Sequence, residues 1–216
     1  MKAVIFDMDG LMFDTENVFM QGCEVVGERM GIKNLREVAM LTLGANKEAS
    51  DRIFQRELGE QFELEQFRSY IKEYLHDFFT NNHVPVKKGL YILLEYLKKE
   101  GYHMAVASST QQSEVMRRLE DAKIRDYFDA VIGGDMIQKS KPEPDIYLTA
   151  CKAISQKPED CYALEDSRNG LLAAFRAGCK AIMVPDLWQP DQEILEIITT
   201  KCDDLEKVKE YIEFMK

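Results

Sequence analysis

The sequence of 216 residues lacks an excess of positive charge and long apolar runs. Its 28 Lys and Arg residues stand against 38 Asp and Glu residues, which gives a formal net charge of −10. Nucleic-acid binders present a basic surface to the phosphates, so we expect no nucleic-acid partner. No apolar stretch approaches the length that crosses a bilayer, and the first one meets Asp7 after four residues, too early for a signal peptide. We therefore expect a cytoplasmic protein with no membrane partner.

Cysteines are few and show no pairing in their spacing. The five cysteines are scattered, without a C-x-x-C pair: Cys23, Cys151, Cys161, Cys179 and Cys202. This pattern argues against a disulfide framework or a zinc site and favours free thiols in a reducing compartment. Internal repeats and Gly/Ser-rich linkers are also missing. The length therefore suits one large domain, or one core that carries a smaller insert.

From residue 85 onward, short apolar runs alternate with helical patterns. This alternation is typical of a parallel sheet covered by helices on both faces, whose buried strands are apolar throughout. The predicted strands are Ala3–Phe6, Met104–Ala107, Ala130–Ile132, Tyr162–Leu164 and Ala181–Val184. We therefore predict an α/β fold with a doubly wound parallel sheet.

The first predicted strand is separated from the others by a long insert. The next strand begins only at residue 104, much further along than one crossover helix requires. Within the intervening stretch, apolar residues recur at helical spacing, as at Leu64, Phe67 and Ile71. The pattern predicts an α/β core made of residues 1–14 and 85–216, and an all-helical insert over residues 15–84.

Polar residues gather at the ends of the predicted strands, where open α/β sheets bind their ligands. The segments are Asp7-Met8-Asp9-Gly10, Ser108-Ser109-Thr110, Lys141-Pro142-Glu143-Pro144-Asp145 and Glu165-Asp166. Each segment alone also suits a turn, a solvated loop or a helix start. Together they would place four carboxylates, several hydroxyls and an ammonium at one edge of the sheet.

The composition of this edge indicates a hard cation and a phosphate. Four neighbouring carboxylates would be costly without a cation, and oxygen ligands without His or Cys favour Mg²⁺. A hydroxyl and an ammonium suit an anionic ligand. One Asp of the D-x-D pair can attack phosphorus as a nucleophile, while the other handles protons.

Four strings, FDMDGLMFDTE, AVASST, KSKPEPDIY and ALEDSRNGLLAAFRAG, resemble the haloacid dehalogenase-like superfamily in order and spacing. The chain is most similar to the β-phosphoglucomutase-like phosphatases, which carry a helical cap between the first and second motifs. The resemblance implies a Rossmann-like core and hydrolysis through an aspartyl phosphate. It further implies Asp7 as nucleophile, Asp9 as general acid/base, and Ser108 and Lys141 as phosphoryl-binding groups.

The resemblance also implies a Mg²⁺ site. Its ligands would be the Asp7 carboxylate, the backbone carbonyl of Asp9 and the Asp166 carboxylate. Glu165 would be a nearby acid whose direct ligation varies within the family.

Three further residues are expected to bind substrate, namely Thr15, Lys47 and Ser109. Thr15 also suits a helix cap, and Lys47 also suits a solvated lysine at a helix start. Lys139 competes with Lys141 for the phosphate, but only Lys141 precedes the K-P-x-P-D pattern of the family.

These motifs are compatible with several functions. We expect a Mg²⁺-dependent phosphatase that acts as a monomer on a small phosphorylated metabolite such as a sugar phosphate. A phosphohexomutase is the alternative, but mutase relatives carry a His and a Lys where this chain has Phe19 and Gln111. A receiver domain would need neither the insert nor the second Asp. A dehalogenase would need neither a metal nor Asp9.

Overall fold

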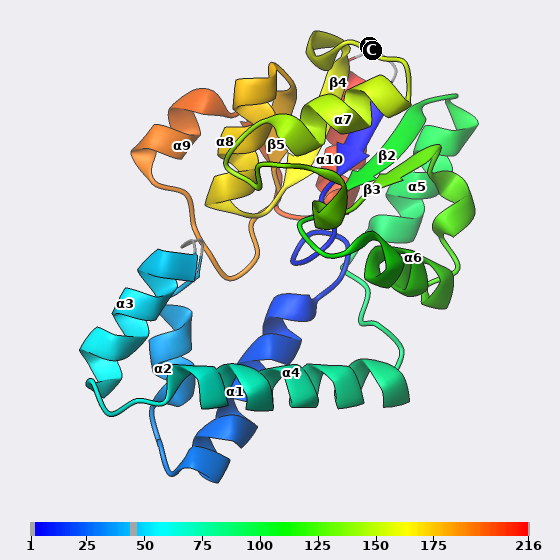
Figure 1. Ribbon diagram of the computed structural model, residues 1–216. Helices are drawn as coiled ribbons and strands as arrows, with labels where there is room; N and C mark the ends of the chain where they lie inside the picture. The colour runs from blue at the N-terminus through cyan, green and yellow to red at the C-terminus, as the bar shows by residue number, and fades with distance from the viewer. Residues whose placement is uncertain (1–2, 44–46, 216) are drawn as a thin grey trace. The chain divides into compact units, whose positions relative to one another are not determined.

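The computed structural model describes residues 3–43 and 47–215 and divides the chain into two compact units. The first comprises Met1–Asp14 and Pro85–Lys216, and the second comprises Thr15–Val84. We call them the core unit and the helical unit. Among the described residues, all strands belong to the core unit (Figure 1).

The core unit is built on a six-stranded sheet with the order β3-β2-β1-β4-β5-β6, in which all neighbouring strands are parallel. The strands are β1 (Ala3–Phe6), β2 (His103–Ala107), β3 (Ala130–Ile132), β4 (Cys161–Glu165), β5 (Lys180–Met183) and β6 (Thr200–Lys201). The predicted α/β class with a parallel sheet is therefore confirmed. The sequence does not predict β6, because its two polar residues form no apolar run.

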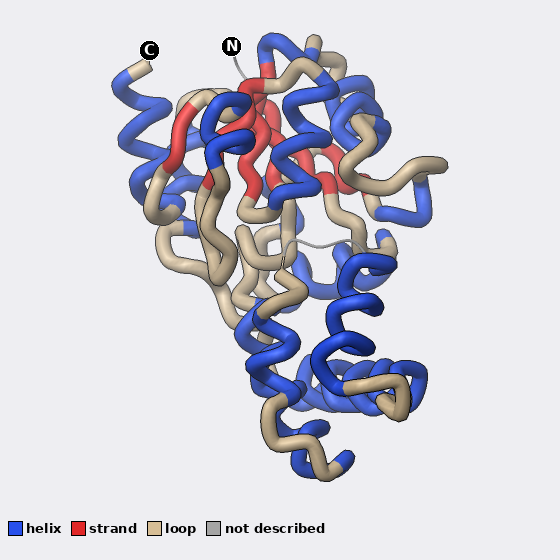
Figure 2. The backbone as a smooth tube through the Cα atoms, turned by 90° about the vertical axis from the view of Figure 1, so that its left-hand side faces the viewer, coloured by secondary structure: helices blue, strands red, loops and turns tan. Residues whose placement is uncertain are grey.

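Helices cover both faces of this sheet (Figure 2). They are α5 (Leu90–Lys99), α6 (Gln112–Asp121), α7 (Asp145–Ala153), α8 (Arg168–Ala177), α9 (Gln192–Ile197) and α10 (Leu205–Phe214). On one face, Ala3 and Ile5 of β1 join a buried apolar cluster with side chains of α7 and α8. Since successive strand residues point to opposite faces, Val4 and Phe6 are buried on the other face, where α10 lies behind the sheet in Figure 1.

The helical unit contains α1 (Thr15–Met30), α2 (Leu35–Met40), α3 (Lys47–Leu58) and α4 (Leu64–Asn81). Helix α1 packs against α2 and α4. Three aromatic rings, those of Phe54, Phe62 and Phe67, contact one another with centroids 5.0 to 5.7 Å apart. Such buried aromatic contacts give the unit an apolar centre of its own. Across the described part of the chain, no helix has both the length and the apolar character needed to cross a membrane.

Hydrogen bonds join the segment where the chain leaves the core unit to the segment where it re-enters. The Asp14 N–H donates to the Pro85 carbonyl and the Lys87 N–H donates to the Met12 carbonyl, each at 2.9 Å. The Lys87 ammonium lies 3.2 Å from Asp14 Oδ1 and 2.6 Å from Asp186 Oδ1. Burial opposes the charge of Lys87, but the two carboxylates outweigh it and raise the Lys87 pKa. The insert of about seventy residues therefore leaves the sheet undisturbed.

The order of the sheet reverses between β1 and β4. From β1 the chain continues to β2 and β3 on one side, whereas β4, β5 and β6 lie on the other. Such a switch point opens a crevice at the carboxyl ends of the two strands. The Asp7 N–H donates to the Leu164 carbonyl at 3.0 Å, so Asp7 lies beside Glu165 at this end. Two polar segments that are far apart in sequence thus meet.

Asp204 offers a test of how the last helix is held. Its carboxylate caps α10 by accepting the Lys207 N–H at 3.0 Å, and it pairs with Lys88 at 2.7 Å. These bonds lower the Asp204 pKa, and the bond to Lys88 contributes most. The stability that the Asp204 carboxylate adds is therefore fully present above the unfolded-state pKa of about 3.9. It is lost as the pH falls through the lower pKa of the folded state. We expect Asp204→Ala to lower the free energy of unfolding by about 1 kcal/mol at pH 7 in urea denaturation.

The exposed neighbour Asp203 provides the control, because it has the same charge and does not cap the helix. Asp203→Ala should change the free energy of unfolding by less than about 0.5 kcal/mol. The difference between wild type and Asp204→Ala should shrink below about pH 4. Equal losses in both variants would contradict the capping role.

Candidate active site

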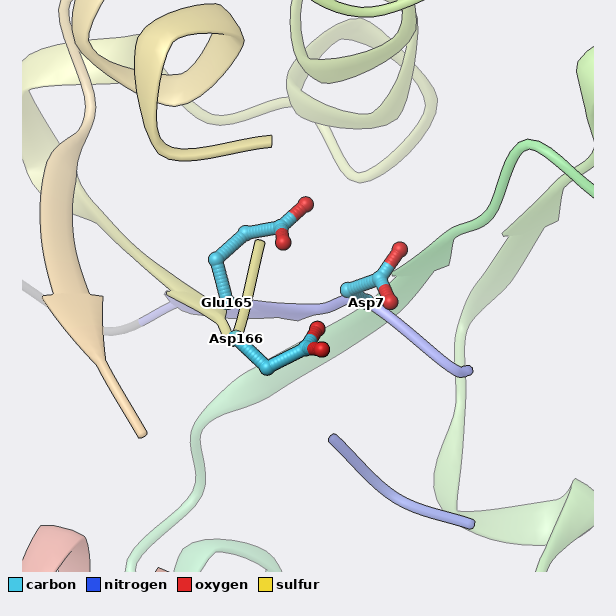
Figure 3. A group of neighbouring side chains, drawn as sticks. All are labelled: Asp7, Glu165 and Asp166. Atoms are coloured by element: carbon cyan, nitrogen blue, oxygen red, sulfur yellow. The ribbon is translucent and has the colours of Figure 1, made fainter. Parts of the chain in front are cut away.

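The site is a cluster of charged side chains at the switch point of the sheet. Asp7 follows β1, Glu165 ends β4, and Asp166 comes next in the chain. The three side chains lie side by side, and one carboxylate oxygen of each lies within 4.8 Å of the others (Figure 3). All three residues are buried, with Glu165 fully so. The sequence expectation that these segments share one edge therefore matches the geometry, although Glu165 belongs to the strand and not to the loop after it.

Lys141 joins this cluster from the loop that precedes α7. Its ammonium lies 2.5 Å from Asp7 Oδ1, 2.6 Å from Glu165 Oε1 and 3.0 Å from the Ala107 carbonyl. Burial opposes the charge, but Asp7 and Glu165 outweigh it and raise the Lys141 pKa, so the side chain stays an ammonium. Lys139, the competing lysine, is exposed. The structure therefore brings Lys141 to the carboxylates.

The electrostatics of Asp7 are set by its surroundings. Burial, and then the nearby charge of Glu165, raise the Asp7 pKa well above its ordinary value, and Lys141 acts in the opposite direction. A group in this position becomes a better nucleophile when further positive charge favours its ionised form.

Glu165 is saturated by donors from the protein. Oε1 accepts from the Lys141 ammonium at 2.6 Å and from the Tyr147 hydroxyl at 2.7 Å. Oε2 accepts from the Ser167 hydroxyl at 3.1 Å and from the Ser167 N–H at 3.3 Å. A carboxylate offers about four lone-pair sites. Glu165 therefore anchors Lys141 first of all, and Tyr147 is a buried supporting residue that the sequence did not single out.

Asp9 is held by two residues that the sequence reading did not assign to the site. Arg118 Nη1 donates to Asp9 Oδ1, and Thr110 Oγ1 donates to Asp9 Oδ2 at 2.8 Å. Thr110 belongs to the polar segment Ser108-Ser109-Thr110 that follows the second predicted strand. Arg118 gave no such signal, because a charged residue inside a helix ordinarily indicates a solvated face.

The remaining predicted residues differ in what the structure describes of them. Ser108 is buried, and its hydroxyl accepts the Thr110 N–H at 3.1 Å, whereas Ser109 is exposed. Thr15 begins α1 and Lys47 begins α3, both in the helical unit. The side chain of Lys47 lies outside what is described.

The donor set of the cluster fits a magnesium ion. Three carboxylates and one ammonium would, when all are ionised, sum to a formal charge of −2, which a divalent cation balances. The metal-binding atoms are all oxygens, as Mg²⁺ prefers. Gly10 allows a close approach to Asp166, since a Cβ built there would stand 2.2 Å from Asp166 Oδ2. The residues present therefore fit the cation that the sequence suggests.

A parallel sheet with an acidic cluster and a buried lysine at its switch point defines an α/β protein that can hold a cation and an anionic ligand there. A sequence model of the haloacid dehalogenase-like hydrolase family matches residues 4–184 of this chain. The chain therefore belongs to that family, and the predicted resemblance is confirmed.

Individual relatives carry both of the activities that compete for this chain. A phosphorylated carbohydrates phosphatase of Thermotoga maritima is 31% identical over 182 residues, covering 84% of each chain. A beta-phosphoglucomutase of Bacillus subtilis is also 31% identical over 193 residues, covering 85% of this chain and 83% of the relative. The crystal structure of CbbY from Rhodobacter sphaeroides in complex with phosphate superposes with a TM-score of 0.73 at 25% identity, covering 96% of both chains. Overall identity does not choose between hydrolysis and isomerisation.

A substitution at Gly170 would test how tightly Glu165 is packed. A Cβ at this position of α8 would stand 1.8 Å from Glu165 Oε1. Gly170→Ala must therefore displace a fully buried carboxylate from Lys141 and Tyr147. We expect the free energy of unfolding to fall by about 1–3 kcal/mol in urea denaturation, together with a loss of hydrolytic activity.

The control places an alanine at an exposed position of the same helix. Phe175 is half exposed, so Phe175→Ala should change the free energy of unfolding by less than about 1 kcal/mol. If Gly170→Ala were as stable and active as this control, Glu165 would not be fixed in the way described.

Proposed function

We propose that the chain is a Mg²⁺-dependent phosphatase that hydrolyses a small phosphorylated carbohydrate through an aspartyl phosphate on Asp7. The observation that carries the proposal is the buried contact of Lys141 with both Asp7 and Glu165 at the switch point. It joins a nucleophile, a fixed positive charge and oxygen donors for a metal. The relative named as a phosphatase of phosphorylated carbohydrates supports the substrate class.

Asp7 is the proposed nucleophile. One of its carboxylate oxygens attacks phosphorus, and the P–O bond of the ester breaks as the Oδ–P bond forms. The Lys141 ammonium and the Ser108 hydroxyl bind the phosphoryl oxygens and stabilise their charge. Water then attacks phosphorus, the Oδ–P bond breaks, and inorganic phosphate leaves with Asp7 restored.

Asp9 is the proposed general acid and base. In the first step its carboxylic acid donates a proton to the ester oxygen that leaves, so that the alcohol departs neutral. In the second step the resulting carboxylate accepts a proton from the attacking water. Asp9 thereby returns to its acid form.

The proposed metal site uses the Asp7 and Asp166 carboxylates and the backbone carbonyl of Asp9. When bound, Mg²⁺ supplies positive charge against the phosphoryl oxygens. Glu165 is the neighbouring acid that keeps Lys141 in place. The raised pKa of Asp7 supports a need for such a cation, since positive charge favours the ionised nucleophile.

The remaining substrate contacts are assigned to Ser109, Thr15 and Lys47. We assign the helical unit the role of a cap that covers the substrate during the reaction, since excluding water strengthens the charge interactions inside such a site.

A β-phosphoglucomutase reaction is the second candidate, and the relative from Bacillus subtilis supports it. A mutase must hold a second phosphate and route protons to a sugar hydroxyl rather than to water. Where mutases carry a His and a Lys, this chain has Phe19 and Gln111. Phe19 can do neither task, and Gln111 offers hydrogen bonds without charge. Hydrolysis is therefore the reaction that we assign.

Asp7→Asn tests the nucleophile. An amide keeps the shape of the carboxylate without its charge, so phosphate release in the presence of Mg²⁺ should fall on the order of 10³-fold or more. Phosphate release is measured with a panel of glucose 6-phosphate, β-glucose 1-phosphate, fructose 6-phosphate and ribose 5-phosphate. Asp203→Asn, at an exposed position, should retain full activity. A folded Asp7→Asn variant with most of the wild-type activity would remove Asp7 from the mechanism.

A second assay separates hydrolysis from isomerisation. We expect phosphate release from β-glucose 1-phosphate to exceed its conversion to glucose 6-phosphate, even with a sugar bisphosphate supplied as primer. The reason is that Phe19 and Gln111 do not provide the charge that a second phosphate requires. Both products are followed in parallel coupled assays. Faster isomerisation than release would favour the mutase.

A further inference from the structure

Both oxygens of the Asp9 carboxylate accept hydrogen bonds from side chains of the core unit. The Arg118 guanidinium donates to Oδ1, and the Thr110 hydroxyl donates to Oδ2 at 2.8 Å. These contacts leave about two of the four acceptor sites of the carboxylate for a reacting proton. Glu165 differs, because protein donors use all of its sites.

Arg118 reaches Asp9 from a distant part of the core unit. It lies in the last turn of α6, and Asp9 lies in the loop after β1. The Arg118 side chain is only 11% exposed, and its Nε also donates to Glu114 Oε1 at 3.0 Å. A guanidinium that is so little exposed to water requires such partners. The Arg118 contact therefore connects the loop of the D-x-D pair to helix α6.

We propose that Arg118, assisted by Thr110, is a positioning residue that orients the Asp9 carboxyl group for proton transfer to the leaving ester oxygen. The proposal rests on the proposed function, in which Asp9 is the general acid. Two donors on two different oxygens fix the rotation of the carboxyl group, and proton transfer depends steeply on such geometry.

A purely structural tie between α6 and the loop is the competing interpretation. The two interpretations differ in their dependence on the leaving group. A sugar alkoxide needs a proton to depart, whereas p-nitrophenolate departs without one. The ratio kcat/KM reports on the steps up to the first irreversible one, so it isolates ester cleavage from the later attack of water.

The experiment compares Arg118→Ala with Arg117→Ala, because both arginines pair with Glu114 and the contact with Asp9 is made by Arg118. The substrates are p-nitrophenyl phosphate and the sugar phosphate of the panel that wild type hydrolyses fastest. For Arg118→Ala we expect kcat/KM to fall about 10- to 100-fold with the sugar phosphate and less than about 3-fold with the aryl ester. Arg117→Ala should change neither value by more than about 2-fold.

Two further variants keep the proposal open to refutation if Arg118→Ala folds poorly. Arg118→Lys should restore part of the sugar phosphate activity, because it keeps a cationic donor. Thr110→Val should show the same selective loss on a smaller scale, because it removes the donor to Oδ2 at constant shape. Thermal melts establish that each variant is folded.

A double-mutant cycle completes the test. Adding Arg118→Ala to Asp9→Asn should cost no further sugar phosphate activity, because Arg118 acts through Asp9. Parallel losses on both substrates, or full additivity with Asp9→Asn, would overturn the positioning role while leaving phosphatase activity in place. Failure of wild type to hydrolyse either ester would overturn the proposed function itself, and the role of Arg118 with it.

Discussion

The contact of the Lys141 ammonium with two buried carboxylates is the constraint on which the site depends. Asp7 follows β1 and Glu165 ends the adjacent strand β4, and burial would make the mutual repulsion of their carboxylates costly. Lys141 lies between them, within 2.6 Å of each. Glu165 is in turn fixed by Tyr147 and Ser167, so the lysine has one well-defined position. The chemistry assigned to Asp7 requires this fixed charge.

Two carboxylates at this edge of the sheet, those of Glu165 and Asp9, accept different numbers of hydrogen bonds from the protein. Glu165 is fully buried and saturated with donors, which suits a residue that holds another one still. Asp9 is 30% exposed and keeps acceptor capacity, which suits a group that exchanges protons. Two carboxylates of similar chemistry thus receive different roles from the number of donors around them.

The topology of the sheet explains why one edge can carry all of these groups. β1 lies between β2 and β4, so the loop after β1 has neighbours from both halves of the chain. The helical unit is inserted just beyond that loop, where backbone hydrogen bonds and Lys87 hold the two connections together. An insert at this point leaves the order of the strands in the sheet intact.

The sequence by itself determined the α/β class, the main strands and the position of the helical insert. These features follow from local periodicity and from apolar runs, which depend on neighbouring residues only. The D-x-D pair, Lys141 and Asp166 were also visible, because each follows or precedes an apolar run within a motif. The tertiary structure alone decided which donors surround each carboxylate. Arg118 stands 109 residues from Asp9 in the chain, and no local pattern relates two groups joined only by the packing of a helix against a loop.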